Sequence, residues 1–110
     1  MIIIESSANI DKRAMFKLTQ NGNLEKVKDH DGEQFTISEY VIFEDVNSEG
    51  KTQEVLAFIT TDGEAFGSNS PTVIKSFRKM LEVFDLPIED VKIVSGESKH
   101  GTRYFNIVLA

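Results

Sequence analysis

Residues 62–84 combine the signals of a turn, a short strand and an amphipathic helix, and they divide the other predicted elements into two groups. Asp62-Gly63 separates two β-prone runs, which is typical of a type I′ hairpin turn. Ser70 offers its hydroxyl group as a helix N-cap, and Pro71 suits the first helical position, where a missing N–H costs nothing. The apolar residues that recur at the three- and four-residue steps of a helix are Val73, Ile74, Phe77, Met80, Leu81 and Phe84.

Alternating and β-branched residues predict five strands around this one clear helix, which we expect to end near Asp85 because Pro87 cannot continue it. The strands are predicted at about 35–45, 55–61, 65–66, 91–98 and 103–109. We therefore expect a mainly β fold with the helix between strands three and four. That order is typical of a five-stranded Greek-key barrel of the oligonucleotide-binding (OB) type. An α+β sandwich with one helix on an antiparallel sheet has nearly the same order and remains the alternative.

The first 34 residues carry weaker signals. Ile2–Ile4 suggest a short strand, and residues 1–20 are interpreted as an arm or an additional element. A short strand is expected through Leu24 and Val27. A length of 110 residues fits one domain, so residues 1–110 are predicted to form a single OB-like unit.

The net charge of −6 argues at first against a nucleic-acid partner. However, most acidic residues lie in residues 1–65, whereas residues 66–110 hold nearly equal numbers of acidic and basic side chains. A local basic stripe is enough to bind phosphates. Cysteine is absent, which excludes disulfides and thiolate metal sites. The longest apolar run, Met1–Ile4, is too short to span a membrane and follows no basic segment, so we expect a cytoplasmic protein.

The predicted hairpin at 98–105 has the side chains that single-stranded nucleic acid requires, namely cations and flat π faces. Its basic tip holds Lys99 and His100, and Arg103 precedes the aromatic residues Tyr104 and Phe105. One of those aromatics must face the core, which leaves the other free to stack on a base. Tyr40 is a further groove candidate, because a tyrosine hydroxyl prefers a wet edge. A plain solvated hairpin tip is the alternative interpretation.

Catalytic signals are absent from the sequence. His30 and His100 are the only histidines and lie far apart in the predicted topology. There is no glycine-rich phosphate loop, nucleophile elbow or paired-histidine metal motif. We therefore predict a protein that is not an enzyme and needs no cofactor.

Three segments together resemble a known family. They are Asp62–Ser70 running into Ile74–Phe77, the hairpin Ser95–Gly101 and the turn Phe43–Lys51. Over roughly residues 12–110 the chain resembles the small single-stranded DNA-binding proteins encoded by phages of Gram-positive bacteria. The resemblance implies an OB-like fold that binds single strands during phage replication or recombination. By position, the DNA contacts that it implies are Lys51, Phe66, Lys99 and Tyr104.

One position departs from the family pattern. The family usually has arginine directly after the hairpin glycine, whereas this chain has Thr102 there and Arg103 one residue later. A shift by one residue places the side chain on the opposite face of a strand. The face served by Arg103 is therefore an open question at the level of sequence.

The function predicted from these observations is sequence-tolerant binding of single-stranded DNA by a monomer or small homo-oligomer, with replication or recombination proteins as further partners. The location would then be the host cytoplasm. The alternative is a small acidic phage protein that inhibits a host protein by mimicking nucleic acid, as some anti-CRISPR proteins do. The residues assigned to nucleic-acid binding are Lys51, Tyr40, Phe66, Lys99, His100, Arg103 and Tyr104.

Overall fold

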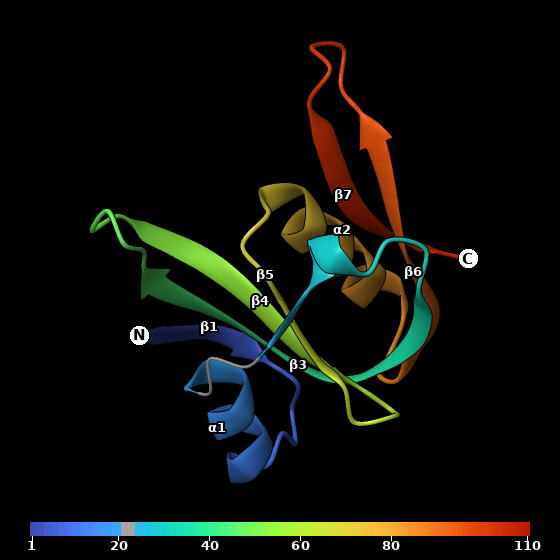
Figure 1. The fold of residues 1–110 in the computed structure, drawn as a ribbon. Coiled ribbons are helices and arrows are strands. Elements are labelled where there is room, and N and C mark those ends of the chain that lie inside the picture. Colours follow the sequence, from blue (N-terminus) through green and yellow to red (C-terminus); the bar gives the residue numbers. More distant parts are fainter. Residues whose placement is uncertain (21–23) are drawn as a thin grey trace.

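The computed structural model describes residues 1–20 and 24–110, which form a mainly β fold with two α-helices (Figure 1). In chain order the elements are β1 (Ile2–Ser6), α1 (Lys12–Thr19), β2 (Glu25–Lys26), the 3-10 helix η1 (Val27–Asp29), β3 (Gln34–Val46), β4 (Thr52–Thr60), β5 (Ala65–Ser68), α2 (Pro71–Val83), β6 (Ile88–Glu97) and β7 (Arg103–Leu109).

The strands of the described residues join in one curled sheet with the order β2-β5-β4-β3-β6-β7. β3 organises this sheet, because β4 pairs along most of one edge while β6 and β1 share the other. The register of β3 shifts near Ile37 toward both β4 and β6, and such irregularities bend a strand. The bend produces a half-barrel whose last strands, β5 with β2 on one side and β7 on the other, are not paired with each other. A gap between two sheet edges therefore remains at this place.

The two helices cover opposite faces of the sheet. The apolar stripe of α2 packs against one face, where Phe77 is fully buried with its ring edge-on to Tyr40 at a centroid distance of 4.9 Å. Leu18 of α1 packs against the other face, in a smaller cluster with Val41 and Phe43. Because both faces are covered, the middle of β3 is apolar on both sides rather than alternating.

The local signals of α2 are confirmed. The Ser70 hydroxyl oxygen accepts a hydrogen bond from the Val73 N–H, and Pro71 begins the helix. The helix ends at Val83, so Phe84 lies outside it and is 42% exposed, which corrects the expectation that Phe84 belongs to the core stripe.

The predicted mainly β class is confirmed, but the count of five strands and one helix is not confirmed for the described residues, which form seven strands and two α-helices. The elements outside that count, β1, α1 and β2, all precede residue 27, and β1 and β2 lie where short strands were expected, at Ile2–Ile4 and through Leu24 and Val27. The type I′ turn at Asp62-Gly63 is wrong. Gly63 has φ of +86°, but Asp90 is the only non-glycine with positive φ in the described residues. The Gly63 N–H donates to the Thr60 carbonyl, which is a type I turn followed by a left-handed glycine.

Candidate nucleic-acid interface

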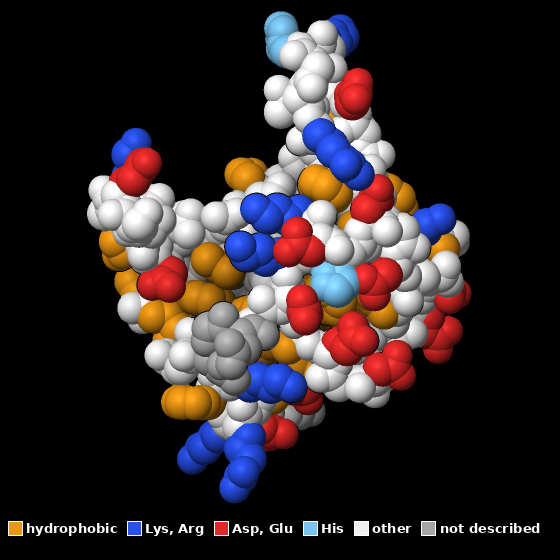
Figure 2. Space-filling view, viewed as in Figure 1, with side chains coloured by type: hydrophobic (Ala, Val, Ile, Leu, Met, Phe, Trp, Pro, Cys, Tyr) orange, Lys and Arg blue, Asp and Glu red, His pale blue; other side chains and the backbone are white. Residues whose placement is uncertain are grey.

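A groove lies where the two ends of the curled sheet approach each other without pairing. Two hairpins project beside it, β3–β4 with its tip at residues 47–51 and β6–β7 with its tip at 98–102 (Figures 1 and 2). The groove has a volume of about 610 Å³. Its lining residues come from the segment 24–28, which includes the start of η1, from β4, from the β5–α2 junction and from β7. Figure 2 shows basic side chains gathered in this hollow.

One wall of the groove carries Lys26 and Lys28, both exposed. Lys26 belongs to β2, which pairs in parallel with β5 so that Lys26 lies opposite Gly67. Leu24 packs directly on Gly67, where an added Cβ atom would lie 3.0 Å from the leucine methyl group. A larger residue at position 67 would push this segment away from β5. The glycine thus allows the two lysines to reach the groove.

The opposite wall carries Arg103 and Phe105 of β7. The Arg103 Nη2 atom donates hydrogen bonds to Asp31 Oδ2 at 3.1 Å and to Ser95 Oγ at 3.3 Å. Its guanidinium carbon lies 5.0 Å from the centroid of the Phe105 ring, within the range of a cation–π contact. Arg103 therefore faces the groove side of β7, where its guanidinium group is paired with the Asp31 carboxylate.

Tyr104 also lines the groove, and its side chain is 47% exposed. It lies opposite Gly96 on the neighbouring strand, and a Cβ atom at position 96 would come within 2.6 Å of the tyrosine hydroxyl oxygen. The ring therefore lies across Gly96 in space that only glycine leaves open. Phe105 packs against the main core. As expected, one aromatic of the pair faces the core and the other is free.

Two of the predicted contact residues are buried, which corrects the expectation that their rings are available to bases. Tyr40 is 6% exposed, and Phe66 is fully buried against Phe35 and Phe58. The remaining three, Lys51, Lys99 and His100, are exposed at or beside the two hairpin tips and do not line the groove. The structure thus places Arg103 and Tyr104 along the groove, on opposite faces of the edge strand β7, and leaves the tip residues at its rim.

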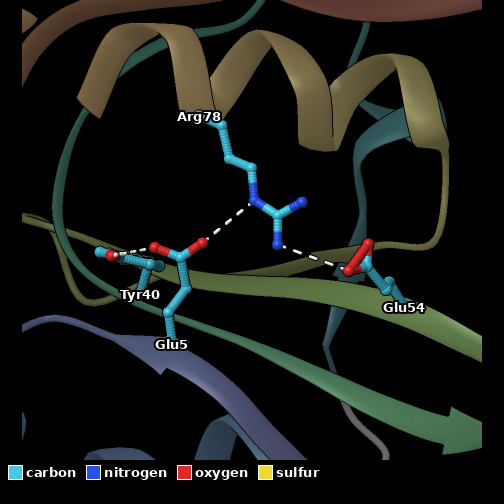
Figure 3. Close-up of polar contacts among 4 residues, drawn as sticks. All are labelled: Glu5, Tyr40, Glu54 and Arg78. Carbon is cyan, nitrogen blue, oxygen red and sulfur yellow. Dashed lines mark hydrogen bonds and ion pairs between the residues drawn. The ribbon is translucent and has the colours of Figure 1, made fainter. Parts of the chain in front are cut away.

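Tyr40 of β3 belongs to a polar network that joins four elements (Figure 3). Its hydroxyl donates to Glu5 of β1 at 3.0 Å, and Arg78 of α2 donates to the same carboxylate at 3.0 Å. Arg78 also donates to Glu54 of β4 at 3.4 Å. Burial, and then the hydrogen bond with Glu5, raises the pKa of Tyr40 to about 12. Tyr40 is thus a neutral hydrogen-bond donor that joins the core to this network.

His30 lies beside the wall of the groove that carries Lys26 and Lys28, which we call the lysine wall. No role was predicted for His30 at this place. Its ring contacts the carboxylates of Glu25, at 3.1 Å, and Glu33, and it lies edge-on to Phe66 at 5.1 Å. Hydrogen bonds to Glu25 and then Glu33 raise the pKa of His30 above its ordinary value. The contacts of the ring therefore connect β2 to the segment before β3. Figure 2 shows acidic side chains gathered beside the basic hollow.

Comparisons with models of known protein families, with curated proteins and with solved structures found no match. Within residues 1–20 and 24–110, no three His, Asp or Glu side chains are placed to hold a metal ion. None of the helices in this part of the chain has the length and apolar character needed to cross a membrane.

Proposed function

We propose that the protein binds single-stranded DNA, with little sequence preference, in the groove between the two hairpins. The observation that carries this proposal is that three cations, Lys26, Lys28 and Arg103, and the exposed Tyr104 line one groove of an otherwise acidic protein. Cations that follow a phosphate backbone and an aromatic face that stacks on a base are the two components of sequence-tolerant binding.

The sheet topology supports the finer proposal of an OB-like barrel. In chain order, β3, β4, β5, α2, β6 and β7 follow the arrangement of strands and helix in that fold. β3 pairs with both β4 and β6, as the first strand of such a barrel must. β1, α1 and β2 are then additions to the barrel, and β2 lies at the edge that the barrel leaves open.

The biological setting follows from the sequence resemblance and is part of the same proposal. We infer a non-enzymatic, DNA-binding viral protein that covers single strands during phage replication or recombination in the host cytoplasm. It would act as a monomer or small homo-oligomer, with replication or recombination proteins as further partners.

The test is a titration of fluorescently labelled oligo-dT at several salt concentrations. The wild-type protein should bind with a salt-sensitive affinity. Lys26→Ala with Lys28→Ala should reduce the log–log salt slope by about 1.4, since each phosphate contact on a single strand contributes roughly 0.7. The matched control is Lys12→Ala with Arg13→Ala, which removes two exposed charges from α1, outside the groove. An equal change in both double variants would contradict the groove as the binding site.

A second candidate function is supported by the acidic side chains next to the groove. Glu25, Asp29, Asp31 and Glu33 are exposed and follow one another closely along the chain. Such a surface suits an inhibitor that occupies the nucleic-acid channel of a host protein. Failure to bind oligo-dT even at low salt would favour this candidate over the first.

A further inference from the structure

A second groove lies between α2 and β4, on the other side of the β5–α2 junction. Its volume is about 440 Å³, and Lys75 and Lys79 of α2 line it. Both lysines are exposed, and they are one helical turn apart on the same face. The groove therefore presents two cations at the spacing of neighbouring side chains.

Asn69 lines both grooves and forms the boundary between them. Its side-chain amide donates to Gln53 Oε1 at 3.3 Å, and Gln53 lines the first groove while the next residue, Glu54, lines the second. The boundary thus consists of an exposed, uncharged pair of amides. A flexible chain that leaves the first groove meets no charge repulsion there, and the amides offer hydrogen bonds to its sugars and phosphates.

The ion pairs around Arg78 suit the second groove for an anion. Glu54 would repel a phosphate, but its carboxylate is paired with Arg78 at 3.4 Å. Hydrogen bonding to Glu5 raises the pKa of Arg78 further, so its charge is permanent. Glu82 is the remaining acidic side chain in the lining. Among the residues that the structure describes, no ion pair involves Lys75 or Lys79, so both remain available to a ligand.

We propose that a single strand longer than the first groove passes Asn69 and continues into the second groove, where Lys75 and Lys79 bind its phosphates. Within the described part of the chain, no aromatic side chain lines this second groove. Its contribution is therefore electrostatic and independent of base identity. This inference rests on the proposed function and adds a defined extension of the binding path along α2.

The experiment compares two lengths of oligo-dT on the intact protein, about 5 and about 15 nucleotides, which span the site sizes of OB folds. Lys75→Ala with Lys79→Ala should leave the affinity for the short strand unchanged. For the long strand it should lower the log–log salt slope by about 1.4, at roughly 0.7 per phosphate contact. Lys12→Ala with Arg13→Ala, with the same change in net charge, should leave both slopes unchanged. Conversely, Glu82→Gln should tighten binding of the long strand only.

The possible results separate this inference from the proposal on which it rests. If the wild type binds neither length, the proposed function fails and the extension fails with it. If the wild type binds both lengths with the same slope, the first groove stands and the extension is overturned. Equal losses in the two double variants would also overturn it, because they would reflect net charge alone. Loss of short-strand binding in Lys75→Ala with Lys79→Ala would make α2 part of the primary site instead.

Discussion

The two walls of the main groove present their cations in opposite ways. On the β7 wall, Arg103 is held by Asp31, Ser95 and the Phe105 ring, so its position is well determined but its charge is partly neutralised. On the other wall, Lys26 and Lys28 have no ion pair among the described residues. They lie on a five-residue segment, residues 25–29, beside the contacts of His30. The β7 wall thus holds its cation in place by several contacts, whereas the lysine wall leaves its two cations available to a ligand.

The largest effect should come from removing the support that both walls share. Phe77→Ala should reduce the free energy of unfolding by about 3–5 kcal/mol, because the ring is fully buried between α2 and the sheet and its loss leaves a cavity. Chemical denaturation measures this loss. Phe16→Ala is the matched control, since Phe16 is 64% exposed on α1 and its removal should change stability by less than about 0.5 kcal/mol. Similar losses in both variants would contradict the described core.

The second effect concerns the aromatic face of the β7 wall. Tyr104→Ala should weaken binding of oligo-dT by about 1–3 kcal/mol, the usual value of one base–aromatic stack. Single-stranded DNA should also quench tyrosine fluorescence in the wild type and much less in Tyr104→Phe, because the only other tyrosine, Tyr40, is buried. Tyr104→Phe should keep most of the affinity. An unchanged affinity in a folded Tyr104→Ala protein would remove stacking from the mechanism.

The β7 wall could be predicted from sequence because its signals are local. Arg103–Leu109 was predicted with its observed bounds, and α2 was predicted from its cap and its apolar stripe. A short strand through Leu24 and Val27 was expected, and β2 lies there, but its place in the wall of the groove could not be predicted in the same way. A two-residue strand has no periodicity, and its position depends on Leu24 packing on Gly67, which lies more than 40 residues further along the chain.

The misplaced aromatics have a similar cause. The preference of a tyrosine hydroxyl for water suggested a wet edge for Tyr40, but Glu5 on β1 accepts a hydrogen bond from this hydroxyl. Phe66 was assigned by resemblance alone, and the structure uses its ring in a stack with Phe35 and Phe58. Burial of one face or the other depends on which elements cover the sheet, and no local pattern contains that information.

Removing the ion pair between Arg103 and Asp31 should make the charge of the β7 wall as available to a phosphate as that of the lysine wall. Asp31→Asn removes the carboxylate from Arg103, so a phosphate no longer has to displace it. Binding of oligo-dT should tighten by up to about fivefold, since an exposed ion pair is worth roughly 0.2–1 kcal/mol. The log–log salt slope should rise by about 0.7, for one additional phosphate contact. Asp29→Asn changes the net charge equally, and Asp29 has no contact with Arg103 among the described residues. Equal tightening of binding in both variants would show that the change in net charge alone causes the effect.

The smallest effect concerns how the lysine wall is held. Because Glu25 and Glu33 raise the pKa of His30 above 6.5, the protonated ring stabilises the folded state. This contribution is fully present below pH about 6.5 and is lost as the pH rises through the higher pKa of the folded protein. The free energy of unfolding of the wild type should therefore include a decrease between about pH 6 and pH 8, on the order of 0.5 kcal/mol as for exposed ion pairs. His30→Gln should lose this component, whereas His100→Gln, changed at an exposed hairpin tip, should retain it. Chemical denaturation at the two pH values measures the difference, and an identical pH dependence in His30→Gln and the wild type would show that the His30 contacts do not hold this wall.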